Sequence, residues 1–331
     1  MAKPIWILLL FFSINSYSAR NFKAIEIPNT TCADGSPYKV FYDKGRDSSR
    51  LAVKLKGGNA CWSYFTCFQL NITPKKAPES VSDGIGFGSD SSSQSPVASS
   101  DFLYFPYCTG DVFLGDHRAS YRGKFYSHGG RQVVEKSMKY LAAQGYFSKR
   151  QEVVLYGDSA GAMGALYHLK TLDQHLHNVK RKTLIADSPG LHFGDTFWSL
   201  FTDNLFSDYS DALAEINYPI SKNKGLIAGV VPQLCQDYPD WEIGIMQTSR
   251  DRTMSLIFGQ ITESWHERKV FSSEGIYQLT KDASDNCSAF VPKSNLHVIL
   301  NKRKGMALRA GGISALKYVF DLVENGAGET F

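Results

Sequence analysis

Short apolar runs alternate with longer amphipathic segments along most of this chain. Six runs are rich in β-branched and aromatic residues, which is typical of strands. They are YKVFYDKG, RLAVKLKGG, FLYFPYC, VVLY, KTLIADSPG and EIGIMQTSRD, beginning at residues 38, 50, 102, 153, 182 and 242. A glycine- and serine-rich stretch over 83–101 predicts a long mobile loop.

Helical spacing appears between these runs. In the segment 129–147, Val133, Val134, Met138 and Leu141 recur at intervals that place them on one helix face, and Gly145 is a suitable stop. Further helices are predicted over 162–171, 195–206 and 310–323. Strands that alternate with helices predict a mainly parallel central sheet with helices on both faces, in a single α/β domain.

The first 19 residues have the layout of a secretory signal peptide. Lys3 precedes an apolar run from Ile5 to Phe12, and small residues follow, with cleavage expected after Ser18 or Ala19. A membrane anchor or a buried first strand is the alternative, but the run is much shorter than the roughly 20 residues that span a bilayer. We therefore expect a secreted (extracellular or periplasmic) domain over 20–331, with no membrane span.

Charge and cysteine content narrow the class of protein. A formal net charge of +4 is too small to indicate nucleic-acid binding. The even number of cysteines in an exported chain favours disulfides, and we expect the pairs Cys61–Cys67, Cys32–Cys108 and Cys235–Cys287. A zinc site is the alternative, but there is no CxxC pair to support it.

The segment GDSAG, from Gly157 to Gly161, fits the G-x-S-x-G pattern of a nucleophile elbow. It follows an apolar strand and precedes a helix, which is the context that the motif requires. Ser159 is then the candidate nucleophile, and the amide of Ala160 is a candidate oxyanion donor at the helix N-terminus. The alternative is a small residue in an ordinary glycine-rich bend.

A serine nucleophile needs a base and an acid. In folds that carry a nucleophile elbow, the three residues follow one another along the chain in the order Ser, Asp or Glu, His. We expect His168, His175 and His177 to face solvent, His192 to lie in a loop and His266 to be exposed on a helix. His297, close to the C-terminal helix, is the candidate base. Asp251 is the favoured acid; Asp187 is the alternative acid or a hydrogen-bonding partner, and Asp251 could instead cap a helix.

Two glycine-containing loops are candidates for the segment that supplies the second oxyanion donor. In KLKGGNACW, the amides of Gly58 and Asn59 can point at the reacting carbonyl, and the Cys61–Cys67 loop would make the turn rigid. The segment His128–Gly130 resembles the HGG loop of lipases, but it lies close to the serine and directly before a helix, so we interpret it as the start of that helix.

Together these blocks resemble the pectin acetylesterase/Notum family of carboxylester hydrolases. GGNACWSYFTC, PYCTGDVFLGD, GDSAGAMGALYH, ADSPG and TSRD…LHVIL are similar to the family's successive blocks, in the same order. The resemblance implies an α/β-hydrolase fold without metal or cofactor. It also implies Ser159, Asp251 and His297 as catalytic residues, with Gly58, Asn59 and Ala160 around the oxyanion.

The resemblance leaves the substrate open. We expect a monomeric serine carboxylesterase that removes O-acyl groups, acetyl in the first place, from polysaccharide. The alternatives are a long-chain protein or lipid O-deacylase of the same fold and a catalytically silent carbohydrate-binding homologue. The aromatic stretch over 197–206 is either the wall of an acyl pocket or an amphipathic helix packed on the core.

Overall fold

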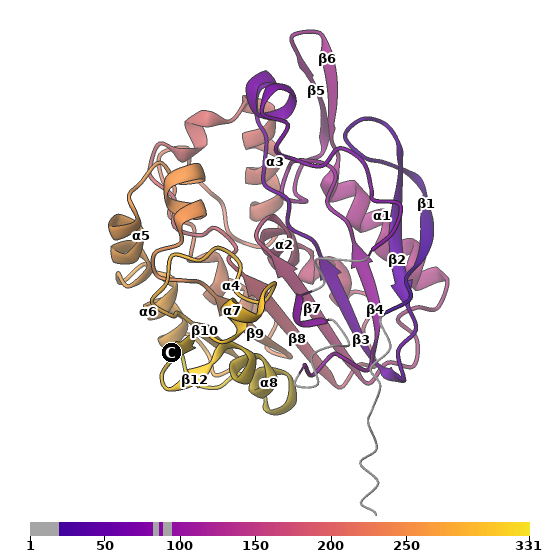
Figure 1. Ribbon diagram of the computed structural model, residues 1–331, viewed down its shortest axis with the longest axis vertical. Coiled ribbons are helices and arrows are strands. Elements are labelled where there is room, and N and C mark those ends of the chain that lie inside the picture. Colours follow the sequence, from indigo (N-terminus) through magenta and orange to yellow (C-terminus); the bar gives the residue numbers. More distant parts are fainter. Residues whose placement is uncertain (1–19, 82–85, 89–94) are drawn as a thin grey trace, which may run out of the picture.

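The computed structural model describes residues 20–81, 86–88 and 95–331. These residues form an eight-stranded sheet, in which the strands lie side by side in the order β1-β2-β4-β3-β7-β8-β9-β10 (Figure 1). The strands are β1 (Lys23–Thr31), β2 (Pro37–Asp43), β3 (Asp47–Leu55), β4 (Ser100–Phe105), β7 (Glu152–Asp158), β8 (Arg181–Asp187), β9 (Trp241–Met246) and β10 (Cys287–Phe290). The predicted signal peptide lies outside the described residues.

The sheet is parallel except at one edge. β1 pairs with β2 and β2 with β4 in antiparallel fashion, whereas β3, β4, β7, β8, β9 and β10 pair in parallel. The prediction of a mainly parallel α/β sheet is therefore confirmed. Two small antiparallel ribbons lie outside it: β5 (His117–Tyr121) with β6 (Lys124–His128), and β11 (Arg309–Ala310) with β12 (Ile313–Ser314).

Helices connect the strands. The α-helices are α1 (Gly130–Ala143), α2 (Ala160–Asp173), α3 (Asp203–Ala214), α4 (Val230–Asp237), α5 (Glu263–Val270), α6 (Ile276–Lys281), α7 (Arg303–Met306) and α8 (Ala315–Asn325). Short π- or 3₁₀-helical turns are η1 (Phe65–Gln69), η2 (Gly86–Gly88), η3 (Phe197–Leu200) and η4 (Thr253–Phe258). None of the helices described is long and apolar enough to cross a bilayer.

Alternate residues of β7 fill two cores, one on each face of the sheet. Val153 and Leu155 pack in the core that holds α1 and α2, whereas Val154 and Tyr156 pack in the core that holds α8. This is the two-residue period expected of a strand covered on both sides. Helices on both faces were predicted, and the two cores confirm it.

Three disulfides join the pairs expected from the sequence: Cys32–Cys108, Cys61–Cys67 and Cys235–Cys287. Cys61–Cys67 closes a short loop that leads into η1, and Cys235–Cys287 joins α4 to the start of β10.

One local prediction was wrong, and another can be compared with the structure only in part. The helix expected over 195–206 is divided into η3 and α3, because Phe201 is extended and the Thr202 side chain accepts a hydrogen bond from the Leu205 amide as the cap of α3. The predicted mobile loop over 83–101 lies in part outside the described residues. Within the described part, Phe87 and Val97 are buried against the core.

Candidate active site

Ser159 occupies the sharp turn between β7 and α2. Its backbone has φ 55° and ψ −121°, a conformation that side-chain-bearing residues rarely adopt. A Cβ on Gly157 would lie 2.1 Å from the Gly161 carbonyl oxygen, and one on Gly161 would lie 2.1 Å from the Leu55 carbonyl oxygen. Both glycines are therefore required by close backbone approach, and the segment has the geometry of a nucleophile elbow rather than of an ordinary bend.

A hydrogen-bonded chain links Ser159, His297 and Asp251. Nε2 of His297 lies 2.9 Å from Ser159 Oγ, and Nδ1 of His297 lies 2.8 Å from Asp251 Oδ2. Asp251 is fully buried, in the segment after β9, and His297 lies between β10 and α7. The structure thus brings together the three residues that the sequence singled out.

Asp251 is held in place by more than the histidine. Its carboxylate also accepts hydrogen bonds from Gln247 Nε2 at 3.2 Å and from the Met254 amide at 2.9 Å. The second bond caps the turn η4, so the capping role considered for Asp251 coexists with its contact to His297.

The environment of His297 favours its protonated form. Burial alone would lower the pKa of the imidazole, but the hydrogen bond and the charge of Asp251 outweigh burial and raise the pKa of His297 above its usual 6.5. A base with a raised pKa accepts the proton of Ser159 more readily.

Asp187, the alternative acid, contacts a different part of the histidine loop. Its carboxylate accepts hydrogen bonds from the amides of Ile299 at 2.9 Å and Leu300 at 2.7 Å. Burial raises the pKa of Asp187 to about 6, although these two hydrogen bonds act in the opposite direction. Asp187 therefore anchors the backbone beside His297, and no hydrogen bond joins its carboxylate to the imidazole among the described contacts.

A buried ion-pair network, not anticipated from the sequence, lies beneath the elbow. Asp158 Oδ1 lies 3.3 Å from Nζ of the fully buried Lys54, and Asp158 Oδ2 lies 3.0 Å from Lys56 Nζ and 2.9 Å from Asn301 Nδ2. Burial would raise the pKa of Asp158, but the two lysines lower it to about 2. The network joins β3, the elbow and the histidine loop; the lysine inside the apolar run RLAVKLKGG was its only sequence signal.

The predicted oxyanion turn lies against the serine. A Cβ on Gly57 would lie 2.9 Å from Ser159 Cβ, and Asn59 lines the same pocket as Ser159 and Ala160. Among the described contacts, the amides of Gly58, Asn59 and Ala160 donate to no protein acceptor. Asn59 has φ 67°, which turns the backbone sharply here.

An apolar pocket opens beside Ser159. It holds about 590 Å³ of space, part of it open to solvent. Aromatic side chains from η3 and its flanks form one wall, and η4 contributes Met254 and Phe258. Phe197, Trp198 and Phe201 of the aromatic stretch line the pocket and also pack in the core, although the stretch is not the single amphipathic helix that was the other interpretation.

The other histidines lie apart from this site, but two of the expected exposures were wrong. His168 is fully buried on α2, with Nε2 2.9 Å from the Phe113 carbonyl, and His266 is fully buried on α5, with Nδ1 2.9 Å from the Ser249 carbonyl. Burial lowers the pKa of His168 to about 3. His192 is also buried, where its Nε2 accepts a hydrogen bond from the Ile276 amide.

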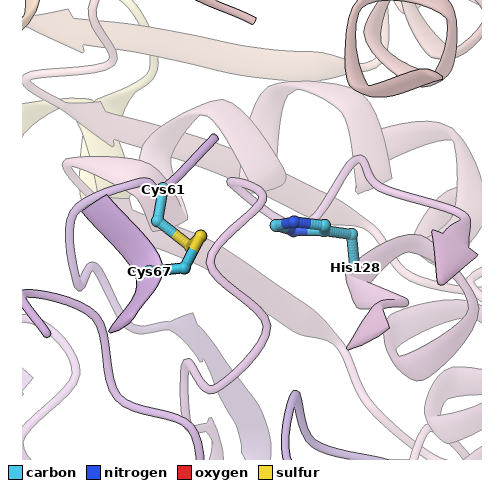
Figure 2. Close-up of side chains that lie close together, drawn as sticks. All are labelled: Cys61, Cys67 and His128. Carbon is cyan, nitrogen blue, oxygen red and sulfur yellow. A yellow bond between two sulfur atoms is a disulfide. The ribbon is translucent and has the colours of Figure 1, made fainter. Parts of the chain in front are cut away.

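Figure 2 shows His128 beside the Cys61–Cys67 disulfide, the single cluster of metal-ligand type within the described residues. The two sulfurs are bonded to each other, and both ring nitrogens of His128 have partners, namely the Tyr121 hydroxyl and the Thr109 carbonyl. The cluster therefore offers no set of free ligands. His128 ends β6 just before α1, as expected for the start of a helix rather than a lipase loop.

A sheet of this strand order, with a serine at the elbow between β7 and α2, defines an α/β-hydrolase fold. The family model described as Pectinacetylesterase matches residues 16–224, and the chain belongs to this family. The match includes Ser159 and the oxyanion turn, whereas Asp251 and His297 lie beyond it.

The proteins that this chain resembles include protein carboxylesterases and pectin acetylesterases. Palmitoleoyl-protein carboxylesterase NOTUM of Mus musculus is 26% identical over 218 residues, which cover 63% of this chain and 42% of the relative. Pectin acetylesterase 11 of Arabidopsis thaliana is 26% identical over 293 residues, which cover 83% of this chain and 71% of the relative. The chain thus spans less than half the length of the Notum relatives that it matches.

Proposed function

We propose that this protein is a serine carboxylester hydrolase with Ser159 as nucleophile, His297 as general base and Asp251 as the residue that orients His297. The unbroken hydrogen-bonded chain from Ser159 Oγ through His297 to Asp251, at a strained elbow, carries the proposal. The names of the relatives, carboxylesterase and pectin acetylesterase, support an ester substrate.

The geometry supports an acyl-enzyme mechanism. His297 Nε2 takes the proton of Ser159 as Oγ attacks the ester carbonyl, and the amides of Ala160 and of the Gly58–Asn59 turn stabilise the oxyanion. The imidazolium then gives its proton to the departing alcohol oxygen, which leaves an acyl group on Ser159. Water, activated by the same histidine, releases the acid.

Acetyl removal from a polysaccharide stays a prediction, and the pocket favours a second candidate. The apolar lining extends from Ser159 to the aromatic side chains of η3 and to Met254 and Phe258 of η4, and such walls suit an acyl chain longer than acetyl. We therefore propose longer-chain O-deacylation as the second candidate. Three disulfides support export of the protein, and the monomeric state remains a prediction.

Hydrolysis of p-nitrophenyl esters from acetate to palmitate tests both the mechanism and the acyl preference. We expect Ser159→Ala to lower kcat about 10⁶-fold, as removal of a serine nucleophile does. Ser148→Ala, an exposed serine, is the matched control and should keep full activity.

The chain length with the highest kcat/KM decides between the two substrate candidates. A maximum at acetate supports the deacetylase, and a maximum at a longer chain supports the second candidate. If folded Ser159→Ala kept the activity of the parent protein, Ser159 would not be the nucleophile. A folded parent protein without activity on any ester would favour the silent binding homologue.

A further inference from the structure

Most of the exposed large apolar side chains lie on segments that ring contacts connect to the pocket. Of the large hydrophobic residues that are exposed in the described structure, Phe271 and Phe320 lie elsewhere. The others lie on three segments: η1 with its following residue, the β5–β6 hairpin and η4. They are Phe65, Leu70, Phe125, Leu256 and Ile257, between 49% and 65% exposed. We call these three segments the mouth surface.

Ring contacts join the three segments to one another and to the pocket. The guanidinium of Arg122, in the hairpin, lies 4.9 Å from the ring centre of Tyr64, next to η1. Trp62, in the same disulfide loop as η1, lies 6.1 Å from the ring of Phe258 in η4, and Phe258 lines the pocket. The hairpin projects beyond the rest of the molecule (Figure 1).

The mouth surface is also cationic. Arg118, Arg122 and Lys124 lie exposed on the hairpin and Arg252 is exposed just before η4, and none of them pairs with a carboxylate in the described residues. Lys75 adds a fifth cation, with its ammonium 4.5 Å from the ring centre of Phe68. Burial and the nearby Lys124 lower the pKa of Lys75, which indicates that positive charge is crowded here.

The carboxylates next to this surface have partners of their own, and Asp116, directly before the hairpin, accepts a hydrogen bond from Gln132 Nε2. Asp34 lies 3.6 Å from Lys76, and Asp208 pairs with His117 at the base of the hairpin. In the part of the chain that the structure describes, no ion pair joins a carboxylate to the hairpin cations or to Arg252, so their positive charge stays available.

We propose that the mouth surface docks on an anionic phospholipid membrane, with the cations on the headgroups and the exposed apolar side chains in the interface. Cations beside exposed aromatic and aliphatic residues are the combination that interfacial binding requires. An acidic polysaccharide would also suit the cations. However, the aliphatic side chains of Leu70, Leu256 and Ile257 offer it neither hydrogen bonds nor a flat ring.

Docking in this orientation would place the pocket mouth at the membrane. Met254 and Phe258 line the pocket while Leu256 and Ile257, on the same turn, face outward. A ligand could then pass from the lipid interface to the pocket with little exposure of apolar surface to water. Docking itself does not depend on the proposed catalysis, so membrane binding and ester hydrolysis can be tested separately.

Sedimentation with phosphatidylcholine vesicles, with and without phosphatidylserine, tests the charge contribution. Asn71→Gln is used as the parent protein, because Asn71 begins an Asn-x-Thr sequon beside Leu70 and a glycan there would cover the surface. We expect binding only with phosphatidylserine, weakened by added salt. Each cation near an anionic lipid surface strengthens binding about fivefold, so Arg122→Glu/Lys124→Glu should weaken it at least about 25-fold.

A second pair of variants tests the apolar contribution. Leu256→Ser/Ile257→Ser should weaken vesicle binding about tenfold, because two apolar side chains no longer enter the interface. Phe271→Ser/Phe320→Ser is the control for exposed apolar residues elsewhere. Lys23→Glu/Lys139→Glu is the control with the same change of charge. Both controls should bind vesicles like the parent protein, and unchanged thermal unfolding establishes that each variant is folded.

Two results would overturn the proposal. The first is that the parent protein does not bind vesicles with phosphatidylserine, or that the control variants lose binding as much as the mouth-surface variants do. The second is binding to soluble polygalacturonate or heparin that depends on Arg122 and Lys124, without vesicle binding. That result would assign the cations to an anionic polysaccharide.

Discussion

Asp187 and Asp251 are both fully buried carboxylates within reach of the histidine loop, yet they bind different atoms of it. Asp251 accepts a hydrogen bond from the imidazole of His297, whereas Asp187 accepts hydrogen bonds from the backbone amides of Ile299 and Leu300, which follow His297 in the chain. Both charges raise the pKa of His297, that of Asp251 more strongly, whereas only the contact of Asp187 holds the backbone beside the imidazole. Their loss should therefore have different consequences for the enzyme.

The raised pKa of His297 predicts the pH dependence of hydrolysis. His297 must be neutral to accept the serine proton, so kcat/KM should rise with pH through a midpoint above 6.5. Asp251→Asn removes the two largest effects that raise the pKa of His297 and leaves burial opposed only by the charges of Asp187 and Asp158, so the midpoint should fall. We expect kcat to drop about 10⁴-fold because the imidazole is no longer held in the correct tautomer. A pH profile of kcat/KM for both proteins checks this.

Glu267→Gln is the matched control for that profile. Glu267 pairs with Arg250 and makes no contact with His297 in the described structure, so its removal should leave the midpoint in place. An unshifted midpoint in Asp251→Asn would show that another group controls the titration.

Asp187→Asn tests positioning. An asparagine amide cannot accept both hydrogen bonds as the carboxylate does, so one buried amide of Ile299 or Leu300 loses a good partner, at a cost of about 1–3 kcal/mol in the free energy of unfolding. We expect kcat to fall while KM changes little, because His297 is displaced and the pocket is not. Urea unfolding and steady-state kinetics measure the two effects.

Asp240→Asn, at an exposed carboxylate, is the control and should change neither quantity appreciably. A loss of activity in Asp187→Asn as large as that in Asp251→Asn, in a folded protein, would make Asp187 the catalytic acid instead.

The sequence predicted Ser159, Asp251 and His297, which the structure brings together, and offered Asp187 as a hydrogen-bonding partner, but it missed the network around Asp158. Ser159 is flanked by glycines, and the order of acid and histidine after it narrowed the choice to Asp251 and His297. Nothing local indicates that Lys54 meets Asn301, because this contact depends on which strands become neighbours. For the same reason, the burial of His168 could not be read from its own helix.

At the scale of elements, the aromatic segment before α3 shows where periodicity fails. Its apolar spacing continues through residues 197–206 and therefore predicts a single helix. The structure interrupts it at Phe201, whose ring lies 5.2 Å from that of Trp62 in a distant loop. A tertiary contact of this kind overrides local propensity, and here it helps to form a pocket wall.

The disulfide between α4 and β10 should contribute more to stability than the one around η1. Cys235 and Cys287 are 52 residues apart, whereas Cys61 and Cys67 are 6 apart. Removal of a disulfide increases the conformational entropy of the unfolded chain, and the increase is larger for a longer loop. The free energy of unfolding should fall by about 4 kcal/mol in Cys235→Ala/Cys287→Ala and by about 2 kcal/mol in Cys61→Ala/Cys67→Ala. Urea titrations of the two variants and the parent protein give these values, and a larger loss in the second variant would contradict the entropic argument.

At the scale of the whole molecule, the alternation of strands and helices was sufficient to predict the parallel sheet and its two covered faces. The antiparallel edge and the β5–β6 hairpin were not predicted. β1 contains a proline and mixes exposed and buried residues irregularly, and β6 carries Lys124 and Phe125 on its exposed positions, so neither has a clear strand pattern. Their pairing depends on partners elsewhere in the chain.

The hydrogen bond between Ser159 and His297 joins residues that are 138 positions apart. During folding, contacts of such high sequence separation close a large loop and form slowly compared with helices and hairpins. The half of the chain that carries the elbow and the oxyanion turn can acquire its local structure while it still lacks a base for the serine. The proposed esterase activity would therefore report the completion of folding: in refolding experiments it should recover no earlier than the burial of Trp241, a residue of the central sheet.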